Sequence, residues 1–329
     1  MGFKNFLFPM ALLASLQGVD ASVFEETTPK IAAYLSTKLC KFGPAEEKDQ
    51  YDLDGGGQGI TTFCQNQNID IIQLAFVNEL RGEPQALSLS GIQGWEITQC
   101  QKQGKTILLS LGGESYKEGG WSTTTEAQRM ADALWKKFGP GVETMIQRPF
   151  GDAIIDGTAG LNKPFYLTAA PQCQWPHKNL QTVLDSNMGV FDAIFVQFYN
   201  NQECGIGAGY RRRSAGPSAR RSGLLGNFNL AQWLNLAATS NKGVSVAVTT
   251  KSGSTLSSKP KIYVGVPGSE LGTSTPKNGY VNPDTLKQAI ESVSFEKNEY
   301  FGGVSIWSAQ FATQNADFLP GVKSVLNGL

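Results

Sequence analysis

The stretch FGDAIIDGTAGLNKPFYLTAAPQC, residues 150–173, decides the fold of this chain. It contains two apolar runs, 150–157 and 165–172, which predict two buried strands. Only residues 158–164 separate them. Neighbouring parallel strands need a crossover of about a dozen residues or more, which is usually a helix. Either one of the two strands is assigned wrongly or a crossover helix is missing after the first, and the strength of both apolar runs favours the missing helix.

Six further runs of the same kind lie on either side of this stretch. Most are apolar throughout rather than alternating, which is typical of parallel strands covered on both faces. In chain order, the eight predicted strands are 30–36, 69–77, 105–113, 150–157, 165–172, 191–200, 261–268 and 302–310. Predicted helices lie between several of them, at 90–104, 123–139, 227–241 and 282–295.

Eight buried strands that alternate with helices predict an α/β fold, a (β/α)8 TIM barrel that is incomplete around strand 4 and helix 4. A doubly wound sheet is the alternative, but eight strands close a barrel and no glycine-rich dinucleotide loop follows a strand. Three segments interrupt the pattern as irregular insertions, 37–59, 205–226 and 242–260. Asn282 followed by Pro283 predicts the first residues of a helix.

The N-terminal residues 1–21 have the composition of a secretory signal peptide. Lys4 is basic, 6–16 are apolar, and Ala21 is the small residue that a signal peptidase prefers. The apolar run is too short to span a bilayer. A buried N-terminal strand or helix is the alternative interpretation. The sequence thus predicts a secreted mature chain, 22–329, that forms one barrel domain.

The charge balance limits the partners of this chain. It has 28 basic and 28 acidic residues and a formal net charge of zero. A neutral chain is a poor binder of nucleic acids and anionic membranes, so we expect neither as a partner. The arginine-rich segment 205–226 could be an arm that binds polyanions, but a solvated insertion is the simpler interpretation. We expect a monomer.

The cysteines predict disulfides, because a secreted chain meets an oxidising environment. Counting alone does not give their pairing. The five cysteines are Cys40, Cys64, Cys100, Cys173 and Cys204. No two of them form a CxxC pair and the only histidine is His177, so the supply of ligands argues against a zinc site. We interpret His177 as a loop residue.

Five segments resemble, in order, strands of the secreted fungal and plant class III chitinases of glycoside hydrolase family 18. They are KTILLSLGG, with the SxGG signature at Ser110–Gly113, FYLTAAPQC, FDAIFVQFYNNQEC, YVGVPGS and FGGVSIWSA. The most specific match is FDAIFVQFYNNQEC. The resemblance covers most of the mature chain. It implies an endo-acting hydrolase of β-1,4-linked N-acetylglucosamine in chitin that needs no cofactor and no metal.

The family carries a DGxDxDxE signature at the end of its fourth strand. The final glutamate donates a proton to the glycosidic oxygen, and the N-acetyl group of the substrate is the nucleophile. Asp156 and Gly157 match the first two positions, but 158–161 read Thr-Ala-Gly-Leu, so the proton donor is missing. Two other acids, Glu114 and Glu203, follow strands, and we interpret both as solvated loop carboxylates rather than replacements.

The resemblance also implies residues that bind the substrate. Gln197 and Tyr199 match a family pair that contacts the sugar next to the cleavage point, and Trp307 matches the tryptophan under that sugar. Packing of these aromatic residues in the core is the alternative. The family begins with YWGQ-like residues after the first strand, whereas this chain has YLSTKLC from Tyr34. We interpret Ser110 as a packing residue.

The same resemblance pairs Cys64 with Cys100 and Cys173 with Cys204, which leaves Cys40 as the odd thiol. Three interpretations of function stay open. The chain is a chitinase by lineage that lacks its acid, a non-catalytic lectin or inhibitor-like barrel that binds chitin or chito-oligosaccharides, or a mis-spliced translation of an active chitinase. In the third case a skipped exon removed both the DxDxE part and the following helix.

Overall fold

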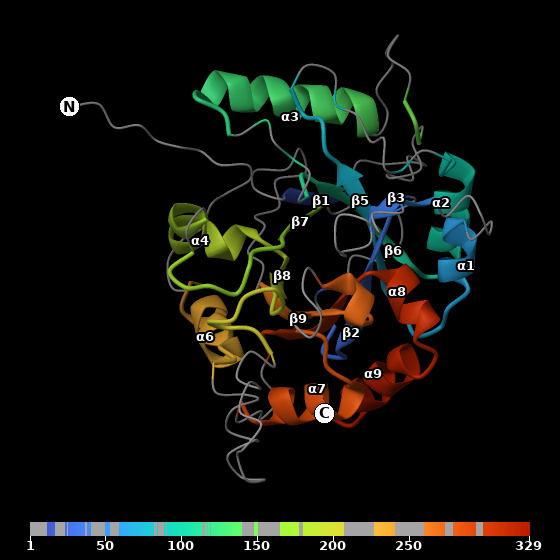
Figure 1. Cartoon of the computed structure of the whole chain (residues 1–329). Coiled ribbons are helices and arrows are strands. Elements are labelled where there is room, and N and C mark those ends of the chain that lie inside the picture. The colour runs from blue at the N-terminus through green and yellow to red at the C-terminus, as the bar shows by residue number, and fades with distance from the viewer. Residues whose placement is uncertain are drawn as a thin grey trace.

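A computed structural model gives the fold of this chain (Figure 1). It describes residues 12–16, 24, 26–36, 38–40, 50–52, 59–81, 84, 89, 91–113, 116, 118, 120–139, 148–150, 165–177, 180–206, 227–240, 260–273, 279–293 and 299–329.

Eight strands close into a barrel in the order β1-β6-β5-β2-β10-β9-β8-β7. Their bounds are β1 Leu12–Leu16, β2 Lys30–Leu35, β5 Ile71–Val77, β6 Thr106–Leu111, β7 Phe165–Ala169, β8 Ala193–Gln197, β9 Lys261–Pro267 and β10 Phe301–Trp307. All neighbours except β1 pair in parallel. The seven parallel strands match seven of the predicted ones and confirm the incomplete (β/α)8 barrel.

The strand that completes the wall is not the predicted one. β1 pairs antiparallel with both β6 and β7, with Leu13 opposite Ser110 and Leu12 opposite Ala169. The predicted strand 150–157 lies outside the described residues except for Phe150. In the full-length chain the apolar part of the predicted signal peptide therefore forms an N-terminal strand between β6 and β7. Cleavage after Ala21 stays a prediction.

Helices surround the barrel (Figure 1). Their bounds are α1 Ile60–Cys64, α2 Gly94–Lys102, α3 Thr124–Phe138, α4 Gln181–Asn187, α6 Leu230–Ser240, α7 Pro283–Glu291, α8 Ala309–Gln314 and α9 Phe318–Asn327. The structure confirms the four predicted helices as α2, α3, α6 and α7. The Asn282 side chain accepts a hydrogen bond of 2.9 Å from the Thr285 N–H and Pro283 is the first helical residue, as predicted.

The irregular insertions are described only in part. Within 37–59, strands β3 (Lys38–Cys40) and β4 (Gln50–Asp52) form an antiparallel pair that the sequence did not predict. Most of 205–226 and of 242–260 lies outside the described residues.

Two apolar layers separate along each strand, because successive side chains point to opposite faces. The outer layer packs between the barrel and its helices. The inner layer fills the barrel and consists of Phe24, Ala32, Tyr34, Ile71, Ala75, Leu108, Tyr166, Ala170, Ala193, Phe195 and Tyr263. Phe24 follows the predicted cleavage site, and its ring packs edge-on against Tyr166 at a centroid distance of 4.8 Å. The start of the predicted mature chain therefore helps to fill the barrel.

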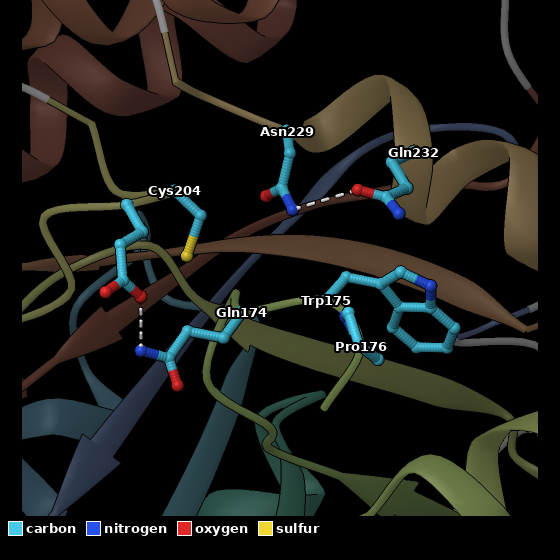
Figure 2. A pocket seen from close by; sticks show the side chains of 7 residues that line it. Gln174, Trp175, Pro176, Cys204, Asn229 and Gln232 are labelled. Atoms are coloured by element: carbon cyan, nitrogen blue, oxygen red, sulfur yellow. Dashed lines mark hydrogen bonds between the residues drawn. The ribbon is translucent and has the colours of Figure 1, made fainter. Parts of the chain in front are cut away.

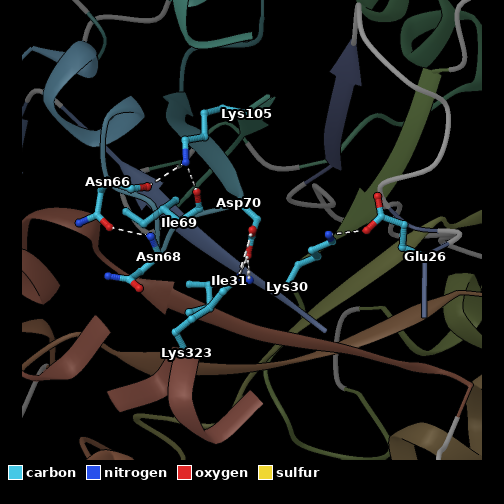
Figure 3. Close-up of polar contacts among 9 residues, drawn as sticks. All are labelled: Glu26, Lys30, Ile31, Asn66, Asn68, Ile69, Asp70, Lys105 and Lys323. Atoms are coloured by element: carbon cyan, nitrogen blue, oxygen red, sulfur yellow. Dashed lines mark hydrogen bonds and ion pairs between the residues drawn. The ribbon is translucent and has the colours of Figure 1, made fainter. Parts of the chain in front are cut away.

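A polar cluster ties the amino-terminal ends of β2 and β5 to the last helix (Figure 3). The Asp70 carboxylate accepts a hydrogen bond of 2.8 Å from the Ile31 N–H and pairs with Lys323 Nζ at 3.1 Å. Lys105 Nζ donates to two nearby backbone carbonyls at 2.6 and 2.8 Å. This end of a barrel supports stability rather than catalysis.

Two disulfides cross-link segments on the outside of the barrel. Cys64 pairs with Cys100, which links α1 to α2, and Cys173 pairs with Cys204, which links the segments after β7 and β8. Both pairings are those that the resemblance implied. No helix among the described residues is long and apolar enough to cross a membrane. In the same part of the chain, no cluster of three or more His, Cys, Asp or Glu side chains could hold a metal ion.

Candidate functional site

Three aromatic side chains gather at the carboxyl-terminal end of the barrel, where active sites of this fold are built. Phe76 and Trp307 stack with ring centroids 5.8 Å apart and an interplanar angle of 25°. Tyr34 packs edge-on against Trp307 at 5.5 Å. Phe76 and Trp307 are half-buried, whereas Tyr34 is buried. The arrangement gives the barrel mouth a partly accessible aromatic surface.

The SxGG signature supports this surface. Gly113 has a φ of +87°, and a Cβ atom at this position would lie 2.7 Å from the Phe76 ring. Only glycine allows both this backbone conformation and the close approach of the ring. The second glycine therefore serves packing, and it sets the position of the Phe76 ring.

Gln197 and Tyr199 lie where β8 ends. Gln197 Nε2 donates a hydrogen bond of 2.9 Å to the Ala170 carbonyl, which fixes the amide. Tyr199 is buried, and the backbone of Gly279 lies so close that a Cβ atom there would sit 2.4 Å from Tyr199 Cβ. Both side chains are thus held in place by neighbouring loops.

The electrostatics of Tyr34 connect these groups. Burial raises the pKa of Tyr34 well above its ordinary value of 10.0, and Tyr199 raises it further, while Gln73 lowers it. Tyr34, Tyr199 and Gln73 are therefore close neighbours in the mouth. No described carboxylate is among the groups that shift this pKa.

The polar side chains inside the barrel are only partly satisfied. Ser305 Oγ donates to Gln73 Oε1 at 3.2 Å. Ser110 Oγ is buried and has no hydrogen-bond partner among the described residues. Such groups usually have partners. Ser110 lies on β6 beside β1, and the described residues supply no polar partner for it there.

Only one of the three candidate acids, Glu203, lies among the described residues, and it is not part of the aromatic cluster of the mouth. Asp156 and Glu114 lie outside the described residues. Glu203 is an exposed loop residue, as expected, and its carboxylate accepts a hydrogen bond of 2.8 Å from Gln174 in a separate pocket. The described part of the mouth can therefore stack and hydrogen-bond a sugar, and it offers no identified proton donor.

Sequence reasoning missed three residues of this site, Phe76, Gln73 and Ser305. Gln73 and Ser305 are polar residues within the otherwise apolar strands β5 and β10. A polar residue at such a position is a sequence signal that its side chain meets a polar group. Phe76 carries no such signal because an aromatic residue near the end of a buried strand is ordinary.

Curated relatives of this chain are chitinases. No protein-family model matches it. A class III chitinase of Arthroderma benhamiae is 34% identical over 320 residues, which cover 84% of this chain and 88% of that protein. Endochitinase 33 of Trichoderma harzianum is 31% identical over 313 residues, which cover 82% of this chain and 86% of that protein.

Solved structures share the fold. The xylanase and alpha-amylase inhibitor protein of Scadoxus multiflorus matches with a TM-score of 0.60 and 24% identity, over 90% of this chain and 98% of that one. A chitinase from Ipomoea carnea matches with a TM-score of 0.60 and 22% identity, over 90% and 99% of the two chains. The identity and coverage of the curated relatives, together with this fold, show that the chain belongs to the class III chitinases of glycoside hydrolase family 18.

Proposed function

We propose that this chain is a secreted protein that binds chitin or chito-oligosaccharides at the barrel mouth and does not hydrolyse them by the family mechanism. One observation carries the proposal. The aromatic surface of the mouth is present, while the sequence from Gly157 to Pro164 contains no aspartate or glutamate after Asp156.

The residues of the mouth fit a binding role. The flat face of Trp307, stacked on Phe76, can pack against the apolar face of an N-acetylglucosamine ring. The Tyr199 hydroxyl and the Gln197 amide can hydrogen-bond the acetamido group, which would orient the sugar.

Hydrolysis has a further requirement that these residues do not meet. In the substrate-assisted route the acetamido oxygen attacks the anomeric carbon, and a carboxylic acid must protonate the leaving oxygen from within hydrogen-bond reach. Without that proton the leaving group departs as an alkoxide. General acid catalysis typically contributes about 100- to 10,000-fold to a rate, so we expect binding without measurable release.

A chitin retention assay, combined with a product assay, tests this proposal. We expect the wild-type protein to be retained on chitin beads and to release no soluble chito-oligosaccharide. Trp307→Ala should strongly reduce retention. Trp95→Ala is the matched control, because Trp95 is 65% exposed on α2 and lies outside the aromatic cluster. Release of oligosaccharides by the wild-type protein, or equal retention of Trp307→Ala, would contradict the proposal.

A second candidate is that the protein is an active endo-acting chitinase and that this sequence is a mis-spliced translation of it. A single deletion after Asp156 accounts for both the missing carboxylates and the missing crossover helix, which favours this candidate. Sequencing the mature transcript across codons 150 to 230 decides it. A longer segment with D-x-D-x-E after Asp156 would establish an ordinary chitinase, and the sequence as given would exclude the family mechanism.

A further inference from the structure

A second pocket opens beside the barrel, between the segments after β7 and β8 and the first turn of α6 (Figure 2). Its volume is about 400 Å³, which lies within the range of small-molecule sites. It is lined by Gln174, Trp175, Pro176, Glu203, Cys204, Asn229 and Gln232. None of these residues belongs to the aromatic cluster of the mouth, and neither Gln197 nor Tyr199 lines the pocket.

The walls of this pocket are fixed by covalent and polar links. The Cys173–Cys204 disulfide joins the two loops. The Cys173 carbonyl accepts hydrogen bonds from Asn229 Nδ2 at 2.9 Å and from Trp233 Nε1 at 3.3 Å. The Trp175 ring packs edge-on against the buried Trp233 ring at 5.5 Å. A ligand would therefore meet a preformed surface, which lowers the entropy lost on binding.

The polar side chains of the pocket keep free hydrogen-bonding groups after their internal bonds are counted. Gln174 Nε2 donates to one Glu203 oxygen at 2.8 Å, and Asn229 Nδ2 donates to Gln232 Oε1 at 3.3 Å (Figure 2). Gln174 Oε1, Glu203 Oε1 and Gln232 Nε2 then have no partner among the described residues. The pocket thus offers these two acceptors and one donor beside an indole ring, and Asn229 Oδ1 is a further acceptor, buried and without a partner among the described residues.

This set of groups selects one class of ligand. Among the described residues, no lysine, arginine or histidine lines the pocket, which disfavours phosphate and other anions. A hydroxyl group both donates and accepts a hydrogen bond, so neighbouring hydroxyls match an amide oxygen, a carboxylate oxygen and an amide N–H together. The apolar face of a sugar ring also matches the Trp175 indole.

We propose that this pocket is a second saccharide site, which takes a neutral mono- or disaccharide unit against Trp175 and holds its hydroxyls with Gln174, Glu203 and Gln232. The inference does not rest on binding at the barrel mouth. It gives the loops that carry the Cys173–Cys204 disulfide a binding role besides a structural one.

Titration calorimetry with neutral sugars tests this site in the full-length protein. The probes are glucose, N-acetylglucosamine, cellobiose, maltose and N,N′-diacetylchitobiose. We expect at least one of them to bind to Trp307→Ala, in which the mouth is disabled. Adding Trp175→Ala to that variant should weaken binding by about tenfold or more, and adding Glu203→Gln by a smaller factor, as expected when a central aromatic contact or one hydrogen bond is lost.

The matched controls are Trp95→Ala for the indole and Asp284→Asn for the charge, since both side chains are exposed on other helices. Neither should change the affinity. The proposal is overturned if no sugar binds to Trp307→Ala, if Trp175→Ala binds as tightly as its background, or if inorganic phosphate or Ca²⁺ binds there in place of the sugars. If the mouth of the wild-type protein binds no sugar while this pocket does, only the proposed function is contradicted.

Discussion

Ser110 and Ser305 are both buried on the inner face of the barrel, at 1% and 2% exposure, but only the Ser305 hydroxyl has a partner among the described residues. Ser305 donates to Gln73, whereas Ser110 has no partner among the described residues. A buried hydroxyl without a partner lowers stability, because its hydration is lost and nothing replaces it. Substituting each of the two serines therefore tests whether the Ser110 hydroxyl lacks a hydrogen-bond partner in the folded protein.

We expect Ser110→Ala to leave the free energy of unfolding unchanged or to raise it by up to about 1 kcal/mol, because the substitution removes an unsatisfied group. Ser305→Ala should lower the free energy of unfolding by about 1–2 kcal/mol, because it leaves Gln73 Oε1 without its donor. Urea denaturation of both variants measures the difference. A clear loss of stability in Ser110→Ala would mean that the hydroxyl has a partner in the folded protein.

Some residues of the site could be predicted from the sequence and others could not, depending on whether they lie within a recognisable motif. Gln197, Tyr199 and Trp307 stand out in the sequence because they fall within specific strand motifs, and the structure places all three at the strand ends. Gln73 and Phe76 belong to a strand with no motif. Their role depends on β5 lying beside β2, and this long-range pairing is not visible in local sequence.

At the scale of elements, His177 takes part in the start of α4. Its Nδ1 accepts a hydrogen bond of 3.0 Å from the Leu180 N–H, and its own N–H donates to Gln181 Oε1. The sequence predicted a loop residue, and the structure confirms the loop. It adds that the imidazole accepts a hydrogen bond from the backbone of Leu180, just before α4, which requires Nδ1 to be unprotonated.

This contact predicts how stability depends on pH. Burial lowers the pKa of His177 below its ordinary value of 6.5. Between the two values the unfolded chain binds the proton and the folded chain does not, so stability falls as pH decreases below 6.5. His177 is the only histidine, so one imidazole NMR signal of the untagged protein reports its pKa.

The control for this prediction is His177→Asn, whose side-chain oxygen can still accept from Leu180 but does not titrate. We expect the stability of wild type to fall relative to this variant as pH decreases below 6.5. Equal pH dependence of the two proteins, or an NMR pKa at or above 6.5, would argue against a buried neutral His177.

The helices that sequence reasoning did not predict share a physical cause. Some are short, such as α1 at 5 residues and α4 at 7, so they show less than two full turns of periodicity. α9 begins Phe-Leu-Pro-Gly, and Pro320 with Gly321 is a turn signal in a sequence. Proline is tolerated in the first turn, where its missing N–H has no partner within the helix. Packing on the barrel stabilises these helices more than local preference does.

At the scale of the whole molecule, the barrel is closed by a strand of unusual origin. β1 pairs with β6 at three register positions and with β7 at five, and it belongs to the predicted signal peptide. Seven parallel strands could be predicted because each is a continuous apolar run. The antiparallel eighth could not, because the same apolar run is also what a signal peptide requires.

Removal of residues 1–21 provides the last test. It shows whether the barrel is closed by β1, from the predicted signal peptide, or by a strand from the mature chain. Without β1, the edges of β6 and β7 lose their partner, and open edges of apolar strands promote association. We expect chain 22–329 to have a lower Tm than chain 1–329 expressed without export, and to form aggregates in size-exclusion chromatography with light scattering. Phe24 is retained in both chains, so filling of the barrel by its ring does not differ between them.

A monomeric 22–329 with an equal Tm would instead mean that the mature chain closes its own barrel. The predicted strand 150–157 would then be the segment to test, because it has the length and apolar content to pair between β6 and β7.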